Sequence, residues 1–464
     1  MGILRPNVTA ETVETDVSYP IGTAGTVAII GNFEKAEHGV IYDFFGVRQA
    51  LRALGENENY SGTECIKQVF KSDQENDSNG ANHIMVYQLG TRQKANLTLN
   101  NIITLEADKG GKYGNNFTIT VIPHQIEEVT LNYDIIIKYN NEIIDHIKKI
   151  QLNDIVNRIN LQTPGINAQL LSPEVPETEE PQNETELTLT EDQPFTGGEE
   201  SENFTIEDIN KALFDLKGEK FDYFISTEIL DMETIYPIIS KWTDIKFKND
   251  KPTTAVLPLT SETRAGNIAI TNIANSKNII YLSQTFNNYS LAPSVARWVG
   301  FIAGLPVNVS GTNKIVGDIE TIYPLYNDDD GDELIEAGIT IFEQKNRQNN
   351  KYGCVSSVTC EKETYSNGDL KIYSEQYITN ILHYLTYYFD LSDWLGNTLI
   401  LADLTSANGQ LLNRADALLS AKIVTNVDVN ATPDEDDPFM LNVDFDAKVP
   451  RIVKGIRKRI KVAL

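Results

Sequence analysis

The stretch Thr26–Gly31, TVAIIG, is a compact apolar run that ends in glycine, a pattern typical of a buried central strand. It is followed by Phe44–Leu54 (FFGVRQALRAL), where apolar residues recur at helical spacing, and by Ala81–Leu89 (ANHIMVYQL), a second apolar run. This strand–helix–strand order predicts an α/β unit.

The same order of elements returns near the middle of the chain. Thr205–Leu216 has helical spacing and begins with a capping pattern, Thr205 followed three residues later by Asp208. Strands and helices then alternate as far as a helix over Leu291–Ala303. We therefore expect a doubly wound mixed sheet in a discontinuous α/β core domain, built from residues 25–95 and 204–345.

A different pattern separates the two halves of this core. The segments LTLNNIITLEA, NFTITVIP and LNYDIIIKYNNEIIDHIKKI alternate apolar and polar residues, as half-exposed antiparallel strands do, and Asn140-Asn141 is a plausible hairpin turn. Residues 172–203 then hold eleven acidic residues and no Lys or Arg. We interpret residues 96–203 as an inserted β-rich domain that ends in a solvated acidic loop.

The pattern changes again beyond Lys345. Two strands are followed by helical segments over Tyr373–Phe389 and Asn408–Ser420, and then by a strand over Lys422–Val429. We expect residues 346–448 to form a C-terminal α+β domain.

The final segment, Val449–Leu464 (VPRIVKGIRKRIKVAL), differs from the rest of the chain in charge. It holds six basic residues and no acidic one, although the chain as a whole has a net charge of −27. Read as a strand, it places Ile456, Ile460, Val462 and Leu464 on one face and Arg457, Arg459 and Lys461 on the other. Its pattern alone leaves two interpretations open: this strand completes its own sheet, or it is given to another subunit.

Composition narrows the class of protein. With 464 residues, the chain is long enough for two to four domains. The strong acidity argues against nucleic acid as a partner, and no apolar run is long enough for direct membrane insertion. The first residues lack the pattern of a secretory signal, and three cysteines without metal-finger spacing indicate a reduced, cytosolic site of assembly.

Motifs for catalysis or cofactor binding are not evident. The five histidines share no metal-type spacing, and Asn327–Glu333 (NDDDGDE) fits the start of a helix better than a calcium loop. Lys109–Gly114 (KGGKYG) has neither a Walker nor a Rossmann spacing. We therefore expect no enzyme activity, no cofactor and no metal site.

Several segments, in the right order, resemble the phage tail sheath family, which includes the sheaths of related contractile injection systems. The matching segments are TVAIIGNFEKAEHG, Tyr113–Val121 (YGNNFTITV), Phe195–Leu216, Leu291–Pro306 (LAPSVARWVGFIAGLP), Asp332–Phe342 (DELIEAGITIF) and the ending Asn426–Leu464. Two of them depart from the family pattern: the first glycine is displaced near Tyr113, and an acidic run replaces the usual Asp-Gly after Gly197-Gly198.

The resemblance implies a structural protein that polymerises as stacked six-membered rings around an inner tube. In this family the terminal arms add strands to neighbouring subunits, the inserted domain faces outward, and contraction drives the tube through a target envelope. The implied partners are other copies of the chain, the inner tube protein, and baseplate and tail-terminator proteins. The implied location is a virion tail or an injection particle, assembled in the host cytoplasm.

The resemblance also assigns residues to subunit contacts. The C-terminal arm, residues 449–464, would use Ile452, Ile456, Arg457, Arg459, Ile460, Lys461 and Val462. An extended N-terminal arm, residues 1–24, would use Val13, Val17, Tyr19 and Ile21. A helix with Asn413, Arg414 and Asp416 is a candidate for contact with the tube.

Two other classes of protein remain as alternatives. An acidic surface-layer or adhesive protein would account for the charge and the β-rich insertion, but the α/β core and the missing signal weigh against it. An α/β hydrolase-like enzyme or transferase would account for the core, but the motifs of such enzymes are missing.

Overall fold

The computed structural model describes residues 25–126, 129–171, 186–201, 204–228, 230–346, 351–361, 374–389, 401–435 and 441–450. The contact residues expected in the two terminal arms lie outside these ranges: Val13, Val17, Tyr19, Ile21, Ile452, Ile456, Arg457, Arg459, Ile460, Lys461 and Val462. Much of the expected acidic loop lies outside them as well.

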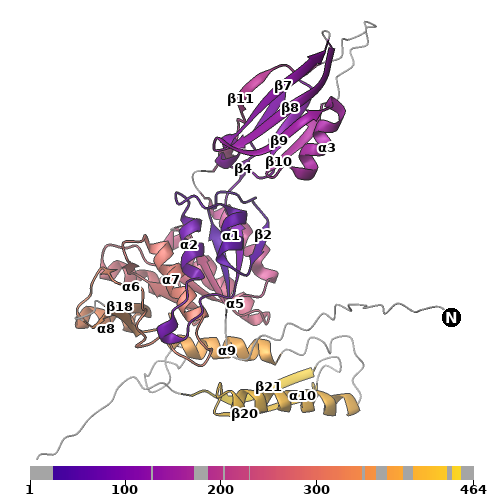
Figure 1. Ribbon diagram of the computed structural model, residues 1–464. Helices are drawn as coiled ribbons and strands as arrows, with labels where there is room; N and C mark the ends of the chain where they lie inside the picture. Colours follow the sequence, from indigo (N-terminus) through magenta and orange to yellow (C-terminus); the bar gives the residue numbers. More distant parts are fainter. Residues whose placement is uncertain are drawn as a thin grey trace, which may run out of the picture.

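An eight-stranded mixed sheet forms the centre of the molecule (Figure 1). Its six parallel strands lie in the order β3 (His83–Gln88), β1 (Thr26–Gly31), β13 (Tyr223–Ser226), β14 (Thr254–Pro258), β15 (Ile279–Leu282) and β18 (Ile339–Asn346). The edge strands β2 (Ile41–Phe44) and β19 (Lys351–Ser356) are antiparallel to their neighbours. The predicted α/β fold with a mixed sheet is confirmed.

Helices cover both faces of this sheet. One face packs against α1 (Val47–Leu54), α2 (Ser61–Val69) and α7 (Leu291–Ala303). The other face packs against α4 (Ile206–Asp215), α5 (Met232–Lys248), α6 (Arg264–Ile273) and α8 (Asp328–Glu336). Strand residues alternate between the two cores, so Val27 and Ile29 face the first and Ala28 and Ile30 face the second. Every residue of α7 is buried, which explains its largely apolar sequence; its polar residues Ser294 and Arg297 are hydrogen-bonded, to the Ser290 carbonyl and to the Asp318 carboxylate.

The sheet extends beyond the boundary expected at residue 345. β18 continues to Asn346, and β19 pairs with it through Phe342 and Cys354, both of which are buried against α7. These residues were expected in the C-terminal domain because two strands in sequence resemble the start of a new unit. Pairing of β19 with β18 instead adds them to the large sheet. A small two-stranded sheet, β16 (Thr285–Phe286) with β17 (Ile322–Tyr323), lies outside it.

The β unit, residues 96–195, has its own hydrophobic core. One sheet contains β5 (Asn96–Leu99), β6 (Ile103–Ala107) and β10 (Ile166–Leu170); the other contains β11 (Thr190–Pro194), β7 (Phe117–Ile126), β8 (Val129–Tyr139) and β9 (Glu142–Ile150); α3 (Leu152–Gln162) completes the unit. Asn140 and Asn141 form the predicted turn between β8 and β9, both with positive φ (49° and 66°), as a two-residue hairpin requires.

A polar cluster fastens the β unit to the carboxyl ends of the parallel strands. There the chain crosses between the two parts in β4 (Arg92–Gln93) and β12 (Glu199–Glu200). The buried Arg92 guanidinium donates to the Asn32 side chain (2.5 Å) and to the Glu34 carbonyl (3.0 Å), and lies 3.7 Å from Glu200. The Tyr60 hydroxyl donates to the same carboxylate (2.7 Å). Charge-assisted hydrogen bonds of this kind hold the two crossing segments in one geometry.

The C-terminal unit lies at the opposite end of the parallel strands (Figure 1). It contains α9 (Gln376–Tyr388), α10 (Leu401–Ser420), β20 (Asn426–Pro433) and β21 (Leu441–Lys448), which share one hydrophobic core. Helix α9 docks on residues at the amino ends of β13, β14 and β15. Its anchors are Asn380 to the Tyr223 hydroxyl (2.6 Å), His383 to Asn278 (2.9 Å), and the Tyr387 hydroxyl to the Pro252 carbonyl (2.7 Å).

The His383 anchor makes the stability of the fold depend on pH. Burial, with a smaller effect of Lys277, lowers the pKa of His383 to about 3 from an ordinary value near 6.5. The unfolded chain therefore binds more protons below pH 6.5, and the protein loses stability as the pH falls from there toward 3. We expect His383 to account for a loss of about 2 kcal/mol in the free energy of unfolding between pH 7 and pH 5.

Urea unfolding of the wild type and of His383→Gln at both pH values measures this contribution. The variant lacks the titrating group and should show the smaller loss of stability between pH 7 and pH 5. Equal losses in the two proteins would mean that His383 is protonated in the folded state.

Candidate assembly site

The hairpin of β20 and β21 has one apolar and one polar face. The pairing runs from Asn426–Lys448 to Pro433–Leu441 without a shift in register. Val429 and Ala431 are buried over α9 and α10, and Val443 and Phe445 lie opposite them on the same face. The Phe445 ring, 37% exposed, also contacts Phe389 (5.4 Å between ring centres). One face of the hairpin is thus packed on the unit, as in many antiparallel sheets.

The two outer edges of this hairpin differ. At β20, the side chain of Asn408 on α10 donates to the Ala431 carbonyl (3.0 Å) and accepts from the Ala431 N–H (2.7 Å). Both backbone groups of Ala431 therefore point away from β21. Along an antiparallel strand, the N–H and C=O groups of successive residues point alternately toward the partner strand and away from it. Val443 lies directly opposite Ala431, so its backbone groups point away from β20. Phe445 and Ala447 follow at every second residue and point the same way as Val443.

The backbone groups on this outer edge of β21 have no hydrogen-bond partner among the described residues. A row of N–H and C=O groups without partners is a template for pairing with another strand. The edge of β21 is therefore the candidate assembly site of this structure.

The polar face of the hairpin is acidic. Asp428, Asp444 and Asp446 are all exposed on it, and Asp428 lies directly opposite Asp446. Like charges at directly opposed positions destabilise a strand pair. A strand with basic residues on the same face would relieve this repulsion.

The chain segment that follows β21 is fixed to α9. The Tyr377 hydroxyl on α9 donates to the Pro450 carbonyl (2.8 Å), two residues after β21 ends. Pro450 also lacks the N–H that a continuing ladder needs. These features direct the end of the described chain toward α9.

The expected tube-contact residues lie on α10, which is longer than predicted. The helix begins at Leu401 and not at Asn408, because Leu404, Ala407 and Leu411 continue the apolar spacing across the polar residues between them. Asn413 and Asp416 are exposed. The side chain of Arg414 is half-buried and donates to the Tyr388 carbonyl (3.2 Å), so it ties α10 to α9.

Two exposed apolar residues on α10 and one polar contact were not predicted from the sequence. Leu412 and Leu419 are 53% and 37% exposed and lie seven residues apart, hence on one side of the helix. Their spacing was visible in the sequence, but leucines are normally assigned to the core. The contact of Asn408 with Ala431 left no signal in the sequence, because it joins residues of two separate elements.

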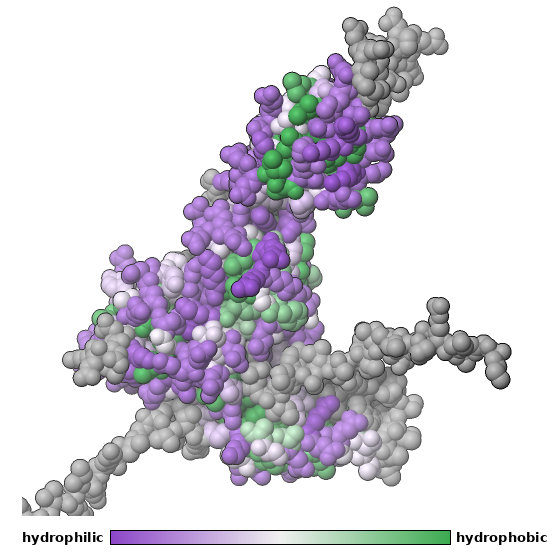
Figure 2. Space-filling view, viewed as in Figure 1, coloured by the Kyte–Doolittle hydropathy of each residue, from purple (hydrophilic) through white to green (hydrophobic). Residues whose placement is uncertain are grey.

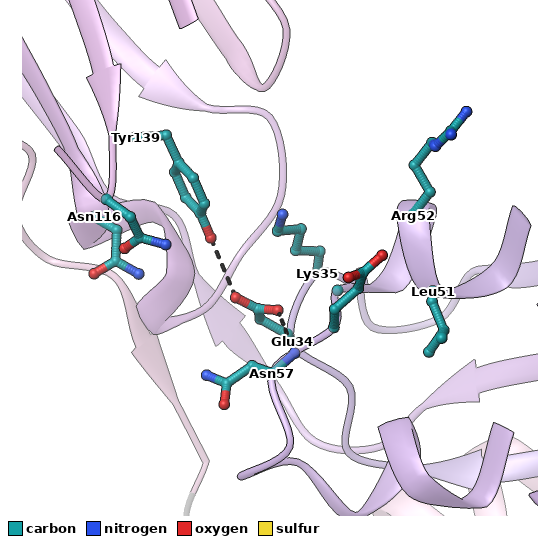
Figure 3. Close-up of a pocket in the computed structure, with 10 residues that line it drawn as sticks. Glu34, Lys35, Leu51, Arg52, Asn57, Asn116 and Tyr139 are labelled. Carbon is teal, nitrogen blue, oxygen red and sulfur yellow. Dashed lines mark hydrogen bonds between the residues drawn. The ribbon is translucent and has the colours of Figure 1, made fainter. Parts of the chain in front are cut away.

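A cleft of about 480 Å³ lies between the large sheet and the β unit (Figure 3). At its base the Glu34 carboxylate accepts hydrogen bonds from the Tyr139 hydroxyl (3.2 Å) and from the Asn57 N–H (3.3 Å). Burial and the neighbouring Glu34 carboxylate raise the pKa of Tyr139 to about 12, so it remains a donor at neutral pH. The Lys35 ammonium lies over the Tyr139 ring (4.8 Å), and this arrangement braces the two units.

Two further groups with strongly shifted pKa values, Lys246 and Asp222, lie away from the cleft and have structural partners. Burial lowers the pKa of Lys246 to about 7, and its ammonium donates to the Glu219 carbonyl (2.6 Å) and lies over the Phe221 ring. Burial raises the pKa of Asp222 to about 6, and its carboxylate accepts from the Thr26 N–H (2.9 Å). These contacts hold chain segments together and do not converge on the cleft.

The described ranges contain neither a metal-binding cluster nor a membrane-spanning helix. No cluster of three His, Cys, Asp or Glu side chains there is arranged to hold a metal ion. The acidic run near Asp330 begins α8, with Asn327 as its cap, as predicted. In the same part of the chain, no helix has the length and apolar character needed to cross a membrane. The visible surface of the β unit and the core is largely hydrophilic with small apolar patches (Figure 2).

Comparison with solved structures identifies the class of fold. The sheath tail protein of Desulfitobacterium hafniense superimposes with a TM-score of 0.68 at 13% identity, covering 95% of this chain and 100% of that one. The sheath tail protein Lin1278 of Listeria innocua gives 0.67 at 14%, covering 92% and 96%. The contracted helical sheath of the anti-feeding prophage gives 0.51 at 9%, covering 98% and 99%.

The chain therefore has the fold of sheath tail proteins over nearly its whole length. Neither a family model nor a curated protein matches its sequence. With identities this low, the likeness concerns the fold.

Proline substitutions test the direction of the backbone groups on β21. Ala447→Pro removes an N–H that points outward, so the free energy of unfolding should change by less than about 1 kcal/mol. Asp446→Pro removes an N–H that faces β20, so it should cost about 2–3 kcal/mol. Thermal unfolding followed by circular dichroism distinguishes the two. Equal destabilisation would contradict the assigned edge.

Proposed function

We propose that this protein is the sheath subunit of a contractile tail or injection machine. The observation that carries the proposal is the match of almost the full chain to sheath tail proteins, at TM-scores up to 0.68. In this proposal the subunits form stacked six-membered rings around an inner tube, and contraction drives the tube through a target envelope. The protein acts as a structural element and uses no cofactor.

Strand exchange would join the subunits. The backbone groups on the outer edge of β21 have no partner among the described residues, and the Tyr377 hydroxyl holds Pro450 at α9. Residues 451–464 could span about 45 Å if extended, which is enough to reach a neighbouring subunit. An arriving strand would gain main-chain hydrogen bonds, and its alternating side chains would fix the register.

Charge would favour the C-terminal segment as the incoming strand. Arg457, Arg459 and Lys461 alternate with the apolar residues of that segment, while the polar face of the hairpin carries three exposed aspartates. If Ile456, Ile460 and Val462 extend the apolar face, the basic residues meet the acidic face. Ile452 would belong to the same arm. The N-terminal residues Val13, Val17, Tyr19 and Ile21 would form a second exchanged strand.

Helix α10 would contact the inner tube. Asn413 and Asp416 are exposed together with Leu412 and Leu419, which gives a mixed polar and apolar surface. Arg414 would support the helix from within. The remaining partners would be baseplate and tail-terminator proteins; one similar solved chain comes from the anti-feeding prophage baseplate, at a TM-score of 0.54 and 9% identity. The particle would assemble in the host cytoplasm.

Electron microscopy of the protein produced with its tube protein tests the proposal directly. Hollow striated cylinders of two different lengths are expected. Monomers alone under all conditions would contradict it.

Deletion of residues 451–464 tests strand exchange. The truncated subunit should keep its circular dichroism spectrum but no longer polymerise, because the hairpin keeps its own core while the exchanged strand is lost. Sedimentation velocity measures the assembly state. Unfolding of the truncated protein would show that the segment belongs to its own core.

Reversal of charge tests the role of the acidic face. Asp444→Lys with Asp446→Lys should slow assembly about tenfold or more at low salt, because attraction of the basic segment is replaced by repulsion. Light scattering follows the rate. The control, Glu56→Lys with Glu207→Lys, changes the net charge equally at exposed sites elsewhere. Equal slowing in both would assign the effect to net charge alone.

A further inference from the structure

We propose that Asn408 closes one edge of the C-terminal hairpin, so that an added strand can join only at β21. This inference rests on the proposed exchange of strands and adds a residue that directs it. The hairpin has two outer edges, and exchange of strands alone does not determine which edge is used.

The contact between Asn408 and Ala431 has the form of a strand pair. The carboxamide donates to the Ala431 carbonyl at 3.0 Å and accepts from the Ala431 N–H at 2.7 Å. A neighbouring strand would use these same two backbone groups. Ala431 is 1% exposed, so its backbone has little access to water as an alternative partner. The side chain of Asn408 therefore occupies the place of an incoming strand.

The remaining groups on this edge are few. Val427, Val429, Ala431 and Pro433 point their backbone outward from β20, by the same alternation that applies to β21. Asn408 uses the groups of Ala431, and Pro433 has no N–H to offer. Among the described residues, Val427 and Val429 are left with both backbone groups free, and they lie next to helix α10, which packs along β20.

The edge of β21 has no such block among the described residues. Val443, Phe445 and Ala447 follow one another as outward-pointing residues, each with an N–H and a C=O. An incoming strand could therefore form a longer uninterrupted ladder there. The asymmetry gives each hairpin a single direction of growth, so two exchanged arms would add in series on one side.

A carboxamide is the side chain best suited to this task at residue 408. It carries one donor and one acceptor side by side, as the backbone does. A carboxylate would lose the donor, and an aliphatic residue would leave both Ala431 groups buried without partners. Edges blocked in this way are a known protection against unwanted pairing of sheets.

Hydrogen–deuterium exchange of the full chain, resolved to single residues, tests the proposal without any substitution. On assembly, the amides of Val443, Phe445 and Ala447 should exchange more slowly by about five- to tenfold, the factor expected for one new hydrogen bond each. The amides of Val427 and Val429 should keep their rates, and Ala431 should be protected in both states. Equal protection of both edges on assembly would overturn the role of Asn408.

The same measurement separates this inference from the proposed function. If no amide of β21 gains protection in the polymer, exchange of strands at this hairpin is wrong as well. If β21 gains protection and β20 does too, only the block by Asn408 fails.

A matched pair of variants provides the second test. Asn408→Ala should free the edge of β20, so that Val427, Val429 and Ala431 become protected on assembly and light scattering reports branched aggregates. Gln410→Ala changes an exposed residue on the same helix and should behave as the wild type. If the β20 amides of folded Asn408→Ala exchange hydrogen for deuterium at the same rate before and after assembly, the proposal is contradicted.

Discussion

The backbone groups along the outer edge of β21, which have no partner among the residues the structure describes, are the constraint around which the C-terminal unit is built. A strand edge in water is tolerated, but every group on it can also pair with a strand of another chain. Helices α9 and α10 pack against the apolar face of the hairpin. The side chain of Asn408 pairs with Ala431 at the outer edge of β20. The same unit carries three exposed aspartates on the polar face of the hairpin and fixes Pro450 to Tyr377 of α9.

The two ends of the large sheet attach different units of the molecule. In α/β folds the carboxyl ends of the parallel strands usually hold a ligand. Here that end carries the β unit, fastened by Arg92 and Glu200 and braced by Glu34 and Tyr139 (Figure 3). The amino ends carry α9 through hydrogen bonds to Tyr223, Asn278 and Pro252. The polar groups of the sheet ends are therefore used for attachment of other units.

The sequence predicted the large sheet because parallel strands buried on both faces leave continuous apolar runs such as TVAIIG. It also predicted the cap of α4 at Thr205 and the turn at Asn140, where local chemistry decides the structure. β21 was not among the expected strands, although Leu441, Val443, Phe445 and Ala447 alternate with polar residues. The positions of β19, Asn408 and Tyr377 depend on contacts between distant segments, which no local pattern encodes.

The attachment of the β unit and the C-terminal unit to opposite ends of parallel strands has a mechanical consequence. A pull between these two units acts along the strands, which lie side by side in one sheet (Figure 1). The hydrogen bonds between strands are then loaded in shear and must break together. A pull across the strands would instead break them one after another, at lower force. The α/β core is thus oriented to resist tension between the β unit and the C-terminal unit.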